Sequence, residues 1–533
     1  MKIRKLIVPE YKNVKVDLNL NADLVTLLVG QNGMGKSNLL EILLQIFDEL
    51  NQLAAGRKPT EEEKIKFDYT LEYECRGKNY RAKKEGDVHY FWEQKIVGNE
   101  STYVQYLNMR DMVLPNQIVG YYSGENKRVK TLVSKHIKRE ESSKRRRYSK
   151  GKEGASEPKK LFFAENRHSM LVLTTLLLYQ DHPQYGDNIK KVLRDVVQID
   201  SWDRIHLRFR NPGFAHMGNL RKEEKTLEDY LGRLTQGEDV ENTDIFWGVK
   251  GNVDKLLRLL LYYALDYGQK FSVFSAKRGS REFFDVESIP SGGDFKELLY
   301  DRFSTPLDFL NTLEECYVLN MIEEYDVRLR KLDEKIFYPY LHLSEGEQQY
   351  LTVMGLIALA HSKQDETLFL LDEPDTHINP QWQRSYIKHI LDLSETEAEK
   401  RSKAFFISTH SPLLVQANSQ GSPFVDLLLF KKGENGKIQI DTKDDAVNNW
   451  RIDQVLMSKY FDLPSSRPVS LDDFMKRRSA VIDGQEKNLA PDNLSGFTDE
   501  FGYLPTGETM ADVEAMVYIH QIAEELRKKG GRL

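Results

Sequence analysis

Cysteine is scarce in this chain. Cys75 and Cys316 are the only two among 533 residues, too few for a disulfide framework or for a zinc site made of cysteines alone. Long apolar runs are also missing, because residues 171–178 and 256–261 fall far short of the ~20 residues that span a bilayer. The first residues are basic in part but carry no apolar segment of the secretory kind. These absences predict a cytoplasmic protein without a membrane partner.

The chain as a whole carries no strong charge of one sign, although one segment is strongly basic. The net charge is −6, yet residues 127–160 hold fourteen Lys or Arg against four Glu, with Lys144 to Arg147 at the centre. Ser and Gly are frequent in the same segment, which predicts a flexible loop. Two interpretations stay open: a solvated linker, or a contact with nucleic-acid phosphates.

A glycine-rich motif stands near the N-terminus, between an apolar run at residues 24–29 and a helical pattern at residues 38–50. Glycines at three of its positions let the backbone turn tightly and direct N–H groups at phosphate oxygens. The pattern G-x-x-x-x-G-K-[ST] predicts that the lysine binds the β- and γ-phosphates, that the serine is a Mg²⁺ ligand, and that the following helix start adds positive potential. The nucleotide-binding residues predicted here are Gly30, Gln31, Asn32, Gly33, Met34, Gly35, Lys36, Ser37 and Asn38.

Two further apolar runs end in residues suited to hydrolysis of a phosphoanhydride bond. Residues 368–371 run into Asp372 and Glu373, at the strand end where open α/β sheets place ligand groups. Asp372 is predicted to orient Mg²⁺, and Glu373 to act as the general base for the attacking water. Residues 405–408 lead to His410, which at the end of a neighbouring strand can donate a hydrogen bond to the γ-phosphate. Lys36, Glu373 and His410 are therefore the predicted catalytic residues.

The string Leu343-Ser344-Glu345-Gly346-Glu347-Gln348-Gln349 resembles the LSGGQ signature of ABC-type ATPases. Ser344 and Glu347 also form an S-x-x-E capping box, so a purely structural role stays open. In the family, the Ser and Gly touch the γ-phosphate held by the opposite subunit. The resemblance thus assigns Ser344, Gly346 and Glu347 to nucleotide binding and implies a homodimer that sandwiches ATP.

Residues 374–380, which read PDTHINP, are similar to the corresponding segment of the SMC, RecF and overcoming-lysogenization-defect branch of these ATPases. The resemblance implies an α/β fold, an ATPase head whose mixed sheet is flanked by helices. The two halves of the head are separated too widely for a transporter ATPase. We expect a first ATPase lobe at residues 1–126, the basic loop at 127–160, a mainly helical insertion at 161–340, a second lobe at 341–450 and a C-terminal extension at 451–533. Within the insertion, the apolar pattern predicts a long helix or helix pair over residues 306–336.

Two elements of an ABC-type ATPase site are less clearly marked in this sequence. Gln117 or Ser123 is a candidate for the glutamine-loop position, and Tyr11 for the aromatic residue that stacks on the base.

A second catalytic centre is not apparent in the sequence. After Pro412 the acidic residues are scattered, and no apolar strand leads to the Glu of a Toprim nuclease domain; H-N-H, H-E-x-x-H and Cys/His patterns are absent as well. An ATPase of this size with a helical insertion and no effector domain resembles the PtuA ATPases of Septu-type antiphage systems, which also occur with retrons. The AriA ATPase of the PARIS system is similar to nearly the same degree.

The PtuA resemblance implies a separate HNH nuclease partner, PtuB, and in retrons a reverse transcriptase with its msDNA. One reading is therefore an ATPase that controls a partner nuclease or toxin. The other is a RecF-like ATPase for DNA repair or maintenance, which would contact DNA through residues 127–160.

Overall fold

The computed structural model divides into two compact units, Met1–Asn448 and Asn449–Leu533, which are described separately below. The structure describes the chain except for residues 21–22, 62, 98–99, 124–133, 135–137, 140–141, 144–145, 147–160, 166–167, 213–245, 248, 267–270, 276–281, 291–292, 361–365, 395–401, 418–423, 434–437, 442–449, 464–465, 485–493, 495 and 529–533.

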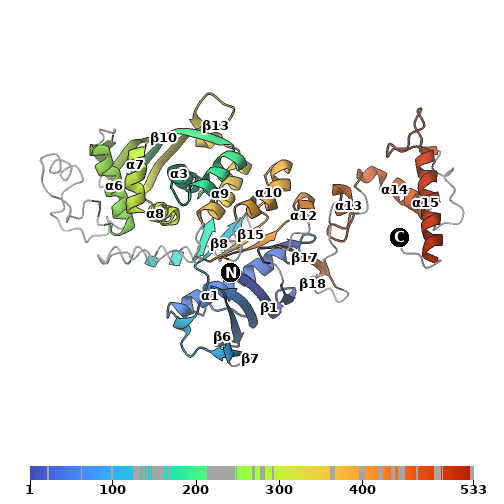
Figure 1. The fold of residues 1–533 in the computed structure, drawn as a ribbon, viewed down its shortest axis with the longest axis horizontal. Helices are drawn as coiled ribbons and strands as arrows, with labels where there is room; N and C mark the ends of the chain where they lie inside the picture. Colours follow the sequence, from blue (N-terminus) through green and yellow to red (C-terminus); the bar gives the residue numbers. More distant parts are fainter. Residues whose placement is uncertain are drawn as a thin grey trace. The chain divides into compact units, whose positions relative to one another are not determined.

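The larger unit is built on a sheet of thirteen described strands in the order β7-β6-β5-β4-β1-β2-β18-β17-β3-β16-β15-β8-β9 (Figure 1). The run from β17 to β9 is parallel, and the run from β7 to β2 is antiparallel. This arrangement confirms the predicted α/β class with a mixed sheet. The strands are β1 (Lys2–Tyr11), β2 (Val14–Asn19), β3 (Val25–Val29), β4 (Tyr69–Cys75), β5 (Lys78–Glu85), β6 (Val88–Val97), β7 (Glu100–Gln105), β8 (Gln117–Tyr122), β9 (Leu161–Ala164), β15 (Thr367–Asp372), β16 (Lys403–Ser408), β17 (Val425–Lys432) and β18 (Ile438–Asp441).

Residue patterning explains the two kinds of strand. Every residue of β3, β15 and β16 is buried, as expected for parallel strands that are covered on both faces. In β4 the burial alternates, so that only one face of the strand packs on the core. The sequence predicted the apolar runs of the parallel strands, whereas it did not predict the β1–β2 hairpin.

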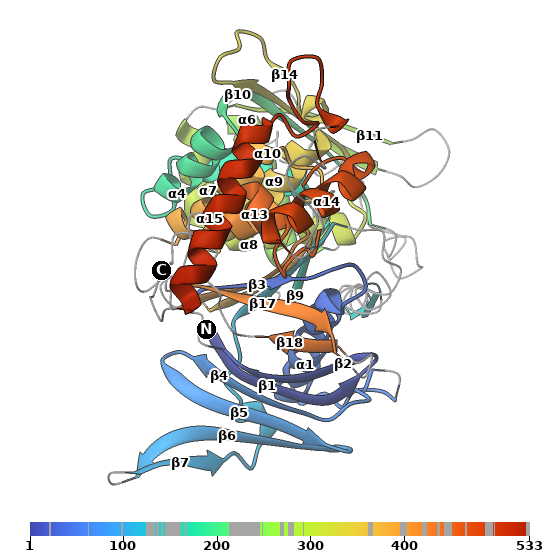
Figure 2. The same ribbon diagram turned by 90° about the vertical axis from the view of Figure 1, so that its right-hand side faces the viewer.

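Helices cover both faces of the parallel part of the sheet. Helix α1 (Lys36–Ala54) lies between the parallel strands and the curved antiparallel strands, as Figures 1 and 2 both show. Its apolar side chains join β1, β4 and β15 in one core. The opposite face carries α9 (Glu345–Leu359) and α10 (Pro380–Asp392). A glycine loop between β3 and α1 is therefore held by two well-packed elements.

The insertion contains more strand than the sequence predicted. A second, antiparallel sheet has the order β11-β12-β10-β13-β14, and β9, expected in the insertion, belongs to the large sheet. The strands are β10 (Ile199–Arg210), β11 (Phe271–Ser275), β12 (Glu282–Pro290), β13 (Ile322–Lys331) and β14 (Tyr338–Pro339). The helices are α3 (His168–Tyr179), α4 (Gly186–Lys190), α6 (Asn252–Asp266), α7 (Gly293–Arg302) and α8 (Pro306–Val318).

The helix predicted over residues 306–336 is wrong beyond Val318. Asn320 has a φ of 57°, a left-handed conformation that an α-helix cannot include. Beyond it, Val327 and Leu329 are buried while Arg328 between them is more exposed, which is the two-residue period of a strand. Apolar residues at 325, 329 and 332 fit a helical spacing equally well, and this coincidence misled the prediction.

The smaller unit spans Asn449–Leu533. It contains α13 (Ile452–Leu456), α14 (Asp472–Asp483) and α15 (Met510–Lys528), and α14 packs against α15 around a small core. The buried residues of this core are Phe474, Val481, Leu494, Leu504 and Val513. Across the described part of the chain, no helix is both long enough and apolar enough to cross a membrane.

Candidate nucleotide-binding site

Four neighbouring parallel strands end together at one edge of the large sheet. Asp372, the last residue of β15, pairs with Ser408 on β16 and with Tyr122 on β8, and Ser408 pairs with Leu28 on β3. The glycine loop follows β3 directly. The parallel register therefore brings segments from residues 30, 122, 372 and 408 to the same edge, where open α/β sheets bind ligands.

The glycine loop adopts a backbone that other residues would strain. Gly30 and Gly35 have φ values of 148° and 83°, and a Cβ on either would lie too close to the Phe430 carbonyl or to Val14, respectively. Helix α1 begins directly after Gly35 without a side-chain cap. The N–H groups of its first turn are consequently left for another acceptor, as in helix starts that bind anions.

Lys36 is buried, with 5% of its surface exposed, and lies at the centre of the site. Its Nζ donates to the Gly30 carbonyl oxygen at 2.7 Å and lies 2.8 Å from His410 Nε2. Burial lowers the pKa of Lys36 to about 8, although the charges of Glu373 and Asp372 oppose that shift. The ammonium group is thus held inside the loop, where a phosphate would compensate its charge.

A pair of oxygen-bearing side chains lies beside the loop. Ser37 Oγ donates to Asp372 Oδ1 at 3.1 Å, and Ser408 donates to the same oxygen. Asp372 is buried, and burial raises the pKa of its carboxyl group, while the hydrogen bonds from Ser408, Ser37 and Tyr122 oppose the increase. The sequence predicted both Ser37 and Asp372 as Mg²⁺ ligands, and the structure places their oxygens side by side.

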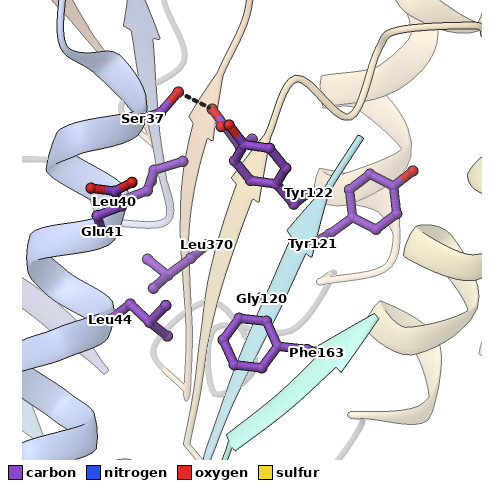
Figure 3. A pocket seen from close by; sticks show the side chains of 10 residues that line it. Ser37, Leu40, Glu41, Leu44, Gly120, Tyr121, Tyr122, Phe163 and Leu370 are labelled. Atoms are coloured by element: carbon purple, nitrogen blue, oxygen red, sulfur yellow. Dashed lines mark hydrogen bonds between the residues drawn. The ribbon is translucent and has the colours of Figure 1, made fainter. Parts of the chain in front are cut away.

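The Ser37–Asp372 pair borders a small pocket that is partly open to solvent. Figure 3 shows α1 supplying Ser37, Leu40 and Leu44 on one side, with Tyr121, Tyr122 and Leu370 on the strands opposite. The rest of the lining comes from Glu41, Gly120, Phe163 and Asp372. Open space beside the two oxygens is what a metal ion and its water ligands require.

Glu373 follows Asp372 with a left-handed backbone, at a φ of 49°. Such a conformation is costly for a non-glycine residue and is found preferentially at functional sites. It is held by two hydrogen bonds from the Glu373 N–H, to the carbonyl oxygen and to the hydroxyl of Ser408, each at 3.1 Å. The Glu373 side chain is 41% exposed, so water can reach it.

His410 lies between the lysine and the glutamate. Its Nε2 is 2.8 Å from Lys36 Nζ and 3.4 Å from Glu373 Oε1. A single ring nitrogen cannot accept from Lys36 and donate to Glu373 at once, so the two contacts are alternatives that depend on the protonation of the ring. Contact with His410 lowers the pKa of Glu373 in spite of burial, which raises it, and the Lys36 charge contributes to the same effect. Glu373 is therefore ionised at neutral pH, as a general base must be.

The start of α9 confirms the predicted capping box. Glu347 N–H donates to Ser344 Oγ at 3.3 Å, and Ser344 N–H donates to Glu347 Oε2 at 2.7 Å. Glu347 also pairs with Lys331; burial alone would raise its pKa, but this contact and the cap bonds lower it. Gly346 packs so closely on the His377 carbonyl that a Cβ there would clash.

The structure does not bring these signature residues to the glycine loop of their own chain. Among the described residues, the side chains of Ser344 and Glu347 form hydrogen bonds only with each other's backbone N–H and with Lys331. Ser344 is exposed at the start of α9. No described hydrogen bond therefore joins the two halves of the predicted ATP site within one chain.

Of the two candidates for the glutamine-loop position, Gln117 is wrong. It pairs with Thr367, the first residue of β15, so it lies ~17 Å from the functional edge, at ~3.3 Å for each strand residue. Ser123 lies at that edge, and its N–H donates to the Asp372 carbonyl at 3.2 Å. The Tyr11 hydroxyl donates to Glu41 at 3.0 Å, and its predicted stacking on a base stays a prediction.

The predicted basic loop at residues 127–160 lies almost wholly outside the described residues. Arg139 is an exception, and its guanidinium pairs with Asp48 at 2.9 Å and with Glu63 at 3.1 Å. This arginine is therefore engaged with carboxylates of the first lobe.

Sequence reasoning missed the side chains that hold the site residues in place. Ser408 fixes both Asp372 and Glu373, and Tyr122 adds a bond to Asp372. Their positions at the ends of apolar strands were visible, but strand order was needed to place them beside the carboxylates.

Fold and site together define a P-loop nucleoside-triphosphate-binding protein of the α/β class. The chain belongs to the family described as "AAA ATPase domain", which matches residues 1–282, more than half of its length. A second family, described as "AAA domain, putative AbiEii toxin, Type IV TA system", matches residues 188–416. The comparison with curated proteins gave no match.

Two solved structures are similar at low identity. The SMC head domain from Thermotoga maritima is 11% identical, with 83% of this chain and 100% of that one covered and a TM-score of 0.29. The recombination mediator protein RecF bound to ATP is 15% identical, with 77% and 92% covered and a TM-score of 0.26. TM-scores this low add nothing to the α/β fold that the strand order establishes.

Proposed function

We propose that the protein binds and hydrolyses MgATP in two sites that a pair of identical chains share. The observation that carries this proposal is the meeting of the glycine loop, the Ser37–Asp372 pair, Glu373 and His410 at one sheet edge. The signature residue Ser344 stays exposed at the start of α9. A second copy would supply its own Ser344 and Gly346 to the phosphates held by the first.

The residues present fit a magnesium ion. Ser37 Oγ and Asp372 are hard oxygen donors 3.1 Å apart, beside an open pocket, and oxygen ligands are those that Mg²⁺ prefers. When bound, the ion would neutralise charge on the β- and γ-phosphates. Ser408 and Tyr122 would keep the Asp372 carboxylate oriented toward it.

The remaining side chains have distinct tasks in this proposal. Lys36 and the free N–H groups at the start of α1 would bind the phosphates. Glu373, ionised and reachable by water, would accept a proton from the attacking water. His410, which is held against Lys36 in this structure, would donate from its ring to the γ-phosphate once Lys36 turns to the phosphates.

The biological role proposed is control of a separate partner nuclease or toxin in an antiphage defence complex. Support comes from the sequence, which carries no second catalytic motif, and from a matching family whose description names a toxin of a toxin–antitoxin system. An HNH protein, and in a retron a reverse transcriptase with msDNA, is the expected partner. The alternative, a RecF-like ATPase acting on DNA itself, has its support in the basic composition of residues 127–160.

Glu373→Gln tests two parts of the proposal together: the hydrolysis of ATP and the pairing of two identical chains. The variant should bind ATP with parental affinity and lose turnover by about a hundredfold or more, since the proton acceptor is gone. It should also accumulate as an ATP-bound dimer, measured by light scattering with and without ATP. Parental turnover in this variant would remove Glu373 from the mechanism.

The same trapped variant, purified from its native host, discriminates between the two roles. Co-purification of a small HNH protein or a reverse transcriptase supports the defence role. Co-purification of duplex DNA that is lost when residues 127–160 are deleted supports the repair role instead.

A further inference from the structure

The two residues that flank His410 are both tied to the turn that follows β15. Thr409 Oγ1 donates to Asp375 Oδ2 at 2.8 Å, and the Ser411 N–H donates to Thr409 Oγ1 at 2.8 Å. Ser411 Oγ donates to Gln383 Oε1 at 2.8 Å, and Gln383 Nε2 donates to the Asp375 carbonyl at 3.1 Å. Asp375, Thr409, Ser411 and Gln383 therefore close a ring of hydrogen bonds, which we name the histidine bracket.

Three of the four residues of the histidine bracket are shielded from water, and Gln383 is partly buried. Thr409 has no exposed surface, and Asp375 and Ser411 are 5% and 7% exposed. Hydrogen bonds in such a setting are stronger than at the surface, and breaking one leaves an unsatisfied polar group. The bracket is consequently stiff in a way that exposed loop contacts are not.

Burying the carboxylate of Asp375 at this position costs free energy. Its Oδ1 accepts no hydrogen bond from another described residue, although it is buried. Burial raises the pKa of Asp375 to about 6, and the Glu373 charge adds to the increase, whereas the bond from Thr409 opposes it. A neutral or apolar side chain would avoid this cost. The stability of the fold therefore does not explain why position 375 carries a carboxylate.

The histidine bracket connects Glu373 with His410. These are the two catalytic side chains whose separation must stay constant in a site that activates water. Glu373 stands two residues before Asp375, and its carbonyl accepts from the N–H and the hydroxyl of Thr376 at 3.2 Å and 2.9 Å. His410 stands between the two bracket residues Thr409 and Ser411. Any shift of the turn after β15 is thereby passed to both Glu373 and His410.

We infer that Asp375 is a positioning residue for hydrolysis, which through the histidine bracket fixes His410 against Glu373 and Lys36. It acts through Thr409, and none of its described hydrogen bonds reaches the glycine loop. The inference rests on the proposed function, because it assigns Asp375 a part in the same hydrolytic site.

Substitution of Asp375 tests the inference by separating kcat from KM for ATP. Asp375→Ala removes the acceptor for Thr409 and should lower kcat about tenfold or more with little change in KM, since misplacement of reacting groups affects the chemical step. Asp375→Asn keeps an acceptor oxygen at nearly the same place and should restore kcat to within about twofold of the parent. Arg384→Ala, an exposed neighbour of Gln383 on α10, is the matched control and should behave as the parent.

Two outcomes would overturn the inference. Asp375→Ala with parental kcat would remove the bracket from the mechanism, and equal loss in the Ala and Asn variants would show that the acceptor is not the cause. Should Asp375→Ala fail to fold, Gln383→Met breaks the bracket at its other side and should lower kcat in the same sense; parental kcat there would contradict the inference too. Loss of turnover in Glu373→Gln together with parental turnover in Asp375→Ala would reject only the inference, whereas turnover in Glu373→Gln would reject the proposed function.

Discussion

At the scale of single residues, the spacing of a few side chains was enough to predict which ones meet. Lys36, Ser37, Asp372, Glu373 and His410 come from three distant segments, yet hydrogen bonds or close contacts connect them in the fold. Each follows an apolar run directly or nearly so, and parallel strands end at a common edge. The same spacing says nothing about burial, which sets the ionisation of these groups.

Lys36 provides a prediction on pH dependence. Its pKa is lowered to about 8 by burial, from an ordinary value of 10.5. Free protein therefore loses the lysine charge as pH rises through 8, whereas bound phosphate favours the charged form. We expect the dissociation constant for ATP to increase above pH 8, at most about tenfold for each pH unit.

Equilibrium binding of a fluorescent, non-hydrolysable ATP analogue to the parental protein, from about pH 7 to about pH 9.5, measures this dependence. Lys36→Ala is the control and should bind weakly at every pH. A constant dissociation constant across the range for the lysine-bearing protein would contradict the assignment.

At the scale of elements, prediction succeeded where the residue pattern has one interpretation. The mainly apolar runs at β3, β15 and β16 became buried parallel strands, and the S-x-x-E string became a capped helix start. Prediction failed at β13, where the apolar residues fit both a helical and a strand period. Gln117 was misplaced because only the register of β8 against β15 tells which end of the strand reaches the site.

Gly346 provides the prediction at this scale. In an exposed helix, replacing glycine by alanine stabilises by about 1 kcal/mol. At position 346 the added Cβ would meet the His377 carbonyl, which is backbone and cannot swing aside. We therefore expect Gly346→Ala to destabilise by about 1–3 kcal/mol, the cost of overpacking, and to lower kcat by displacing the turn that follows Glu373.

Thermal unfolding and ATPase assays on the same sample check this expectation. Gly496→Ala is the matched control, because a Cβ there meets nothing within 4 Å. A Gly346→Ala protein as stable and as active as the parent would mean that α9 and the turn move independently.

At the scale of the whole molecule, the account depends on a second copy. From a family resemblance, the sequence predicted that two chains hold ATP between them. The fold adds a physical reason to expect such a pair. Ser344 is exposed, and its described hydrogen bonds do not reach the glycine loop of its own chain. A symmetric pair would bring each exposed helix start to the partner's phosphates and create two equivalent sites.

Mixing two inactive variants tests that claim most directly. Lys36→Ala removes the phosphate lysine, and Ser344→Arg blocks the signature surface, so neither variant alone should hydrolyse ATP. A mixed dimer would contain one intact site, made of the Ser344→Arg chain's glycine loop and the Lys36→Ala chain's signature. The mixture should recover about a quarter of the parental rate if chains pair at random; a mixture no more active than its two components would contradict the shared site.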